Sequence, residues 1–112
     1  MFARANRLTK TKDIEKVFKH GRSHYENILG IKAVSNGLNY NRFTVIVSLK
    51  VSKKAILRNR LKRQIRSLLQ IEEKQLKSGY DLAVVCLPES LNQEIKQLQQ
   101  TLIKCLQKLN LY

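Results

Sequence analysis

The chain is 112 residues long and carries 22 Lys and Arg residues against 8 Asp and Glu residues, for a net charge of +14. This length fits one domain over residues 1–112, and a hydrophobic fraction of 43% excludes a chain too polar to fold. The longest apolar run, residues 82–87, is far shorter than the roughly 20 residues of a membrane span, and no export signal is visible, so we expect a cytoplasmic protein with no membrane partner.

The amino-terminal part predicts a short helix followed by extended chain. Apolar side chains recur at helical spacing over residues 12–20, Thr9 or Thr11 can cap the start, and Gly21 stands at the end. Residues 23–35 then alternate in the manner of a strand, or of two strands with a break near Glu26 and Asn27. A cluster of Asn and Gly residues follows and predicts a turn.

The remaining chain predicts a strand, a helix, a strand and a helix. Residues 43–49 are rich in β-branched side chains, and residues 80–87 form a second apolar run that Pro88 ends. The helical pattern of residues 54–77 lies between them and is long enough to join parallel neighbouring strands. Leucines at steps of three or four predict a final helix over residues 91–109. The expected fold is therefore α+β, a single sheet of about four strands with three helices in the order α-β-β-β-α-β-α.

The positive charge is concentrated in residues 50–66, which we call the basic segment. It contains eight cations and no acid, whereas residues 67–112 are neutral overall. On a helix, the apolar side chains of residues 57–69 fall in one stripe and the cations fill most of the remaining surface. A merely solvated face usually mixes signs of charge, so this one favours a polyanionic partner. The predicted binding residues are Lys50, Lys53, Lys54, Arg58, Asn59, Arg60, Lys62, Arg63 and Arg66.

Nucleic acid is the polyanion that fits the basic segment best. A helix that lies on a membrane would need large aromatic side chains, and residues 57–69 contain none. Four of the eight cations are arginines, whose planar guanidinium groups can bind phosphate at two points or stack on bases. Asn59 can add an amide contact to a base edge or a 2′-hydroxyl, which favours RNA.

The sequence predicts no catalytic or metal-binding site within the protein itself. Cys86 and Cys105 lie in apolar patterns with no Cys-X-X-Cys spacing, so we expect reduced, unreactive thiols. His20 and His24 are separated by the predicted helix end at Gly21, so we expect no metal shared between them. No serine or cysteine stands in a recognisable nucleophile motif, and no glycine-rich phosphate loop is present.

These residues together resemble the protein component of bacterial ribonuclease P. Arg58 to Arg66 (RNRLKRQIR) is similar to that family's Arg-Asn-Arg signature. Residues 7–21 resemble its amino-terminal helix with the closing glycine, and residues 79–81 (GYD) resemble the start of its last strand. With residues 47–50 set against the family's Ser-Lys-Lys element, Leu49 stands where the family usually has Lys.

The resemblance implies a left-handed crossover through the basic helix and a protein that is monomeric outside its ribonucleoprotein. It implies a catalytic RNA partner that removes the 5′ leader of precursor tRNA, with magnesium acting alongside that RNA. In the family the basic helix contacts the RNA, and a cleft between the first helix and the sheet holds the single-stranded leader. The cleft residues so implied are Arg7, Ile14, Phe18 and Tyr25. For Phe18, core packing against the sheet is an equal alternative.

Two other functions stay open from the residues alone. A structural RNA-binding protein of the ribosomal type would share the basic helix without any role in cleavage. A protein nuclease acting alone would need converging carboxylates and imidazoles, of which the sequence offers few. The leading hypothesis is a non-catalytic subunit of an RNA-based endonuclease, which lowers the electrostatic cost of bringing two polyanions together.

Overall fold

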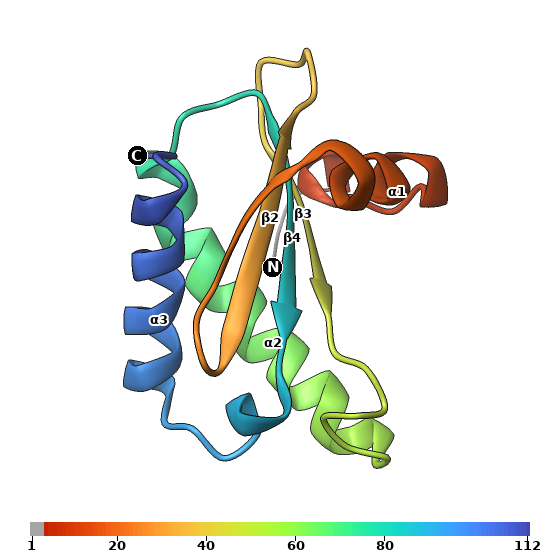
Figure 1. Cartoon of the computed structure of the whole chain (residues 1–112), viewed down its shortest axis with the longest axis vertical. Helices are drawn as coiled ribbons and strands as arrows, with labels where there is room; N and C mark the ends of the chain where they lie inside the picture. The colour runs from red at the N-terminus through yellow and green to blue at the C-terminus, as the bar shows by residue number, and fades with distance from the viewer. Residues whose placement is uncertain (1–3) are drawn as a thin grey trace.

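The helices and strands follow the predicted α-β-β-β-α-β-α order in a computed structural model of the chain, which describes residues 4–112 (Figure 1). The described residues also form short 3₁₀ turns at Arg4–Asn6, Glu73–Gln75 and Pro88–Ser90. The fold is therefore the α+β fold that the sequence predicts. Its elements are α1 (Thr11–His20), β1 (Arg22–Tyr25), β2 (Leu29–Ser35), β3 (Arg42–Ile46), α2 (Ala55–Glu72), β4 (Tyr80–Cys86) and α3 (Ile95–Lys108).

The four strands form one mixed sheet in the order β1-β2-β4-β3. β1 pairs with β2 and β2 with β4 in antiparallel fashion, whereas β3 and β4 are parallel neighbours, as the length of the intervening helix predicts. The β3–α2–β4 crossover is left-handed, in agreement with the resemblance (Figure 1). α2 and α3 cover one face of the sheet, and α1 lies across the other.

Two hydrophobic clusters of unequal size hold the layers together. The larger one lies between the sheet and the α2–α3 layer, where strand alternation places Leu29, Ile31 and Val84 against Ile65 and Leu102. The smaller one lies beneath α1 and contains the fully buried Val17 with Leu8 and Ala83. α1 therefore has less buried apolar surface behind it than the helices of the opposite face.

The predicted ends of several elements were wrong. β3 ends at Ile46 instead of residue 49, because a turn follows in which the Val51 N–H donates to the Ser48 carbonyl oxygen at 3.1 Å. α2 ends at Glu72 instead of residue 77, and its last turn tightens into a 3₁₀ turn. α3 begins at Ile95 instead of residue 91, because Pro88–Ser90 forms a separate turn.

The caps predicted for α1 are only half right. Lys10 occupies the N-cap position without a side-chain hydrogen bond, so neither Thr9 nor Thr11 caps the helix. Gly21 does end it, but with an extended φ of −74°. A side chain at this position would collide with the Val17 carbonyl oxygen and crowd that of Ala33. The glycine is required here because the chain passes close to the last turn of α1 and to the backbone of β2.

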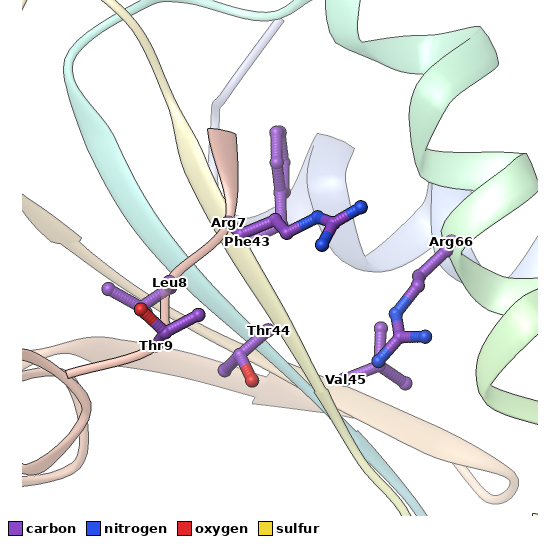
Figure 2. A pocket seen from close by; sticks show the side chains of 7 residues that line it. All are labelled: Arg7, Leu8, Thr9, Phe43, Thr44, Val45 and Arg66. Carbon is purple, nitrogen blue, oxygen red and sulfur yellow. The ribbon is translucent and has the colours of Figure 1, made fainter. Parts of the chain in front are cut away.

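The segment before α1 extends the sheet at its β3 edge (Figure 2). Arg7 forms an isolated parallel bridge with Phe43, and the Leu8 N–H donates to the Phe43 carbonyl oxygen at 2.8 Å. Leu8 is buried beneath α1, so the chain crosses from the β3 edge onto the α1 face at this residue.

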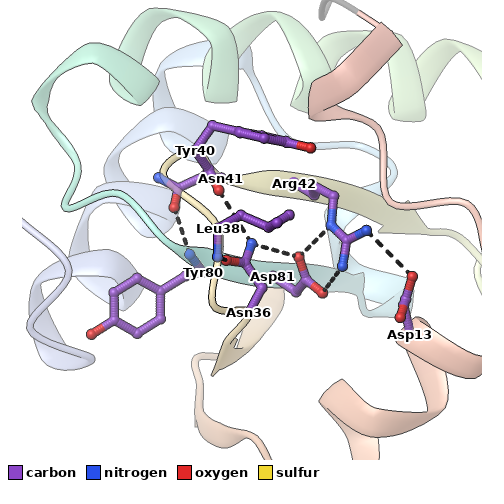
Figure 3. Close-up of polar contacts among 8 residues, drawn as sticks. All are labelled: Asp13, Asn36, Leu38, Tyr40, Asn41, Arg42, Tyr80 and Asp81. Carbon is purple, nitrogen blue, oxygen red and sulfur yellow. Dashed lines mark hydrogen bonds and ion pairs between the residues drawn. The ribbon is translucent and has the colours of Figure 1, made fainter.

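A buried carboxylate ties together the starts of β3 and β4 (Figure 3). Asp81 is 2% exposed and accepts two hydrogen bonds from the neighbouring Arg42, from Nε at 2.8 Å and from Nη2 at 2.6 Å. The Asn36 side-chain amide donates a third at 2.9 Å. Arg42 also reaches Asp13 of α1 at 3.3 Å, so one guanidinium group links both strands to the helix. Its hydrogen bonds with Asp81 raise the pKa of Arg42 above its usual value.

Replacing Asp81 with Asn should destabilise the fold, because it leaves the Arg42 guanidinium without its buried counter-charge. We expect the D81N variant to lose about 3 kcal/mol of unfolding free energy in urea titrations at neutral pH. The matched control is D13N, whose carboxylate is 30% exposed and sits farther from Arg42. It should lose less than about 1 kcal/mol. Equal losses in the two variants would contradict the central role of Asp81.

Candidate nucleic-acid interface

α2 packs on the sheet through the apolar stripe that its sequence predicts. Leu61, Ile65, Leu68 and Leu69 are buried against the sheet and α3, and Leu57 is half-buried. The predicted binding residues occupy the rest of the surface: Asn59, Arg60 and Arg63 are exposed, and Arg58, Lys62 and Arg66 are half-buried. The structure therefore brings the helical members of the predicted site together on one outward face.

The loop before α2 adds three further cations to this face. Lys50, Lys53 and Lys54 are all exposed, directly ahead of the first helical turn. Ser52 organises the loop: its hydroxyl accepts a hydrogen bond from the Lys54 N–H at 3.1 Å, and its carbonyl oxygen accepts one from Arg58 Nη1 at 2.9 Å. All nine predicted residues therefore belong to one continuous loop-and-helix element.

The charges of this element are not compensated within the described protein. In residues 4–112, every ion pair to a carboxylate involves His24, Arg42 or Lys104, and none involves the basic segment. The charges also oppose the helix dipole, since Lys54 and Arg58 lie at the positive end of α2 and Glu72 lies at its negative end. A bound polyanion would relieve both effects.

Two exposed apolar side chains within or directly before the basic segment were not predicted. Ile56, in the first turn of α2, is 81% exposed, and Leu49, in the loop before it, is 65% exposed. Both fall outside the buried stripe, which is the signal that could have identified them from the sequence. The basic surface consequently offers apolar contacts beside its cations, which suits the faces of unpaired bases.

A second surface lies on the opposite face of the sheet, where α1 crosses β2 and β4. Phe18 and Tyr25 are 40% and 42% exposed, so Phe18 is not a core residue. Lys32 of β2 places its ammonium group 5.5 Å from the Phe18 ring centroid and 5.8 Å from that of Tyr25. We call these three residues the aromatic cluster. Lys32 was not among the site residues predicted from the sequence, because its pattern is that of an ordinary strand residue that faces solvent.

The Tyr25 ring has a fixed position within the aromatic cluster. Tyr25 pairs with Gly30 across the β1–β2 hairpin, and any side chain at Gly30 would collide with the ring. The missing side chain therefore leaves the space that the ring fills. Partial burial raises the pKa of the Tyr25 hydroxyl above its usual value, so the ring stays neutral in the physiological range.

The other two residues implied for the leader cleft lie elsewhere. Ile14 is half-buried and packs in the small cluster between α1 and the sheet. Arg7 bridges to Phe43 at the outer edge of β3, with β3 and β4 between it and Lys32 of β2. The structure thus brings Phe18 and Tyr25 together and separates Arg7 from them.

The His, Cys, Asp and Glu side chains of the described residues form no metal-binding cluster. In residues 4–112, no three His, Cys, Asp or Glu side chains come close enough to hold a metal ion. Burial raises the pKa of the Cys86 thiol to about 12 and that of Cys105 to about 11, so both thiols are protonated and unreactive. His24 pairs with Glu26 and thereby lowers the pKa of that carboxyl. No helix of this part of the chain is long and apolar enough to cross a membrane.

Comparison with known proteins identifies the family. The family model described as Ribonuclease P matches residues 2–110. The chain belongs to the ribonuclease P protein component family. Membership explains why a small domain carries so large an uncompensated charge, because it places the chain in an RNA-binding ribonucleoprotein that processes tRNA. It also rules out the ribosomal alternative.

Individual relatives support this assignment along almost the whole length. The chain is 33% identical over 106 residues to the ribonuclease P protein component of Alkaliphilus oremlandii, covering 95% of this chain and 92% of that protein. It is 33% identical over 108 residues to that of Clostridium botulinum, covering 96% of each. The solved Staphylococcus aureus RNase P protein superimposes with a TM-score of 0.88 at 24% identity, covering 97% and 99% of the two chains, and confirms the fold.

Neutralising one cation of α2 should stabilise the free protein at low salt. Arg63 lies three residues from both Arg60 and Arg66, and each like-charge pair costs about 0.2–0.5 kcal/mol. We expect R63Q to gain about 0.5 kcal/mol in urea unfolding, and the gain to vanish near 1 M salt, where screening acts within about 3 Å. The control is K96Q on α3, which has no charged residue three or four positions away and should show no gain. A gain that persists at high salt would show that repulsion is not its cause.

Proposed function

We propose that this chain is the protein subunit of a ribonuclease P whose RNA component removes the 5′ leader from precursor tRNA. The basic segment binds the catalytic RNA, and the aromatic cluster holds the single-stranded leader. The observation that carries the proposal is the outward face of α2, which bears one sign of charge and no ion pair to a carboxylate in residues 4–112.

The basic segment supplies affinity by neutralising phosphates. Each cation that meets a phosphate releases counterions, and the logarithm of affinity then falls with the logarithm of salt by about 0.7–0.9 per contact. About five such contacts give a slope of roughly −4. The arginines of α2 can also bind phosphates at two points, which orients the RNA as well as attracting it.

The aromatic cluster has the features that a single-stranded leader requires. Phe18 and Tyr25 are partly exposed aromatic residues, and bases can stack on such rings with a gain of about 1–3 kcal/mol for each stacked base. Lys32 between them can meet a backbone phosphate. The cluster lies on the face of the sheet opposite α2, so leader and catalytic RNA can bind at the same time without competing.

In this proposal the bond is broken by the RNA, with magnesium bound to RNA phosphates. The described protein side chains do not fit a metal site of their own, because no three suitable donors come together in residues 4–112. The protein instead adds positive potential where two polyanions meet, which lowers the magnesium concentration that assembly needs. We place the subunit in the cytoplasm, since its two thiols are buried and unpaired. We also propose, from the family resemblance, that it is a monomer outside the assembly.

Reconstitution with a bacterial ribonuclease P RNA tests the main proposal. The protein should accelerate cleavage of precursor tRNA at low magnesium and lose this effect as magnesium rises. In R60Q, affinity for the catalytic RNA should fall about tenfold and the salt slope should flatten by about 0.7–0.9, because one phosphate contact is lost.

K96Q is the matched control, since it removes one exposed cation from α3 and leaves the basic segment intact. It should bind like the unmodified protein at every salt concentration. Failure of the unmodified protein to stimulate cleavage at any magnesium concentration would refute the assignment.

The aromatic cluster should act only on substrates with a leader long enough to reach it. We expect F18A to weaken binding of a precursor tRNA with a long single-stranded leader by about tenfold, because one stacking contact is lost. Binding of a precursor with a one-nucleotide leader should not change. The control E15Q alters an exposed residue of the same helix and should affect neither substrate. Equal weakening of both substrates by F18A would contradict a leader site.

A further inference from the structure

The outer edge of β3 is paired along only part of its length. Leu8 covers the edge at Phe43, where its N–H meets the Phe43 carbonyl oxygen. Backbone groups of a strand alternate in direction, so the N–H and C=O of Val45 point to the same edge as those of Phe43. In residues 4–112 no further bridge continues along that edge. A hydrogen-bonding backbone edge therefore remains open beside Val45.

A pocket of about 280 Å³ lies at this open edge (Figure 2). The segment before α1 forms one wall, β3 forms the floor, and Arg66 reaches over from α2. Phe43, Val45 and Leu8 supply apolar surface, and Thr9 and Thr44 supply hydroxyl groups. The guanidinium groups of the two arginines come from elements far apart in the sequence and flank the same space.

The charge of the pocket is wholly positive. Arg7 and Arg66 line it, and none of the other five lining residues is acidic. In residues 4–112 neither arginine forms an ion pair with a carboxylate. Two guanidinium groups around one cavity match a phosphate, which accepts hydrogen bonds from both.

We propose that this pocket receives one unpaired nucleotide of the RNA that covers the basic segment. Its phosphate lies between Arg7 and Arg66, and its base lies against the apolar floor, where the Val45 backbone can meet the base edge. The volume is at the lower limit of cavities that hold organic ligands, about 300–1,000 Å³, which suits a single nucleotide and excludes a duplex. Base-paired RNA keeps its bases stacked inside the helix, so the nucleotide must be unpaired.

The catalytic RNA is the source of this nucleotide, and the inference rests on that part of the proposed function. Arg66 belongs to the basic segment, so RNA bound along α2 reaches the pocket without leaving the protein surface. The aromatic cluster proposed for the leader lies where α1 and β1 meet β2, with β4 between it and the β3 edge.

A double-mutant cycle tests whether the two arginines share one phosphate. The full-length variants R7Q, R66Q and R7Q/R66Q are titrated with a bacterial ribonuclease P RNA at several salt concentrations. Each single variant should bind about tenfold more weakly and flatten the salt slope by about 0.7–0.9. The double variant should lose little more affinity than either single one, and its slope should flatten by one contact only.

The control pair is R7Q with R63Q, because Arg63 is exposed on α2 and does not line the pocket. These two losses should add. Additive losses for R7Q with R66Q, with a slope flattened by two contacts, would overturn the shared site. If the unmodified protein does not bind the catalytic RNA at all, the proposed function itself fails, and this result is distinct from additivity.

Crosslinking identifies the nucleotide. T9C places a thiol on the pocket wall for a photoactivatable crosslinker, and the buried Cys86 and Cys105 remain unlabelled. With catalytic RNA and precursor tRNA both present, T9C should crosslink to an unpaired nucleotide of the catalytic RNA. S67C, exposed on α2 outside the pocket, should crosslink to different nucleotides. Crosslinks from T9C to the leader, or only to base-paired RNA, would overturn the proposal.

Discussion

The structure depends on one helix that buries an apolar stripe and carries a single sign of charge on the rest of its surface. Burial of Leu61 and Ile65 fixes the rotation of α2 on the sheet, and this rotation forces every cation of the helix outward. The packing of α2 on the sheet and α3 opposes the repulsion between these cations. In residues 4–112 no ion pair with a carboxylate reduces that repulsion. The hydrophobic core thereby provides the free energy that keeps this positively charged surface assembled in the protein alone.

The sheet keeps the basic face of α2 and the aromatic cluster on opposite sides of the domain. β2 contributes Gly30 and Lys32 to the aromatic cluster through one set of alternate residues, and Leu29 and Ile31 to the α2 layer through the other. The network around Asp81 fixes the strand starts and links them to α1. Both surfaces are consequently positioned by the same four strands, which gives a small domain a defined geometry between the two nucleic acids that we propose it binds.

Patterns of residues close together in the sequence predicted those features of the structure that depend on nearby residues. Helical and strand periodicity gave the element order, and the run of cations at 50–66 gave the members of the α2 face. The start of α3 was wrong because a turn at Pro88–Ser90 separates residue 91 from the helix. Lys32 and the position of Arg7 depend on contacts between segments distant in sequence, such as the bridge from Arg7 to Phe43, and no periodicity encodes them. The handedness of the crossover came from family resemblance alone.

The position of β4 has a consequence for how the protein is made. β4 lies between β2 and β3 in the sheet but follows both of them in the chain. A nascent chain on the ribosome can form the β1–β2 hairpin early, but β2 and β3 cannot join one sheet until Tyr80–Cys86 has been synthesised. α2, whose backbone hydrogen bonds are local, can form earlier. The sheet closes in one late step, and its basic helix is complete while the central strand is still missing.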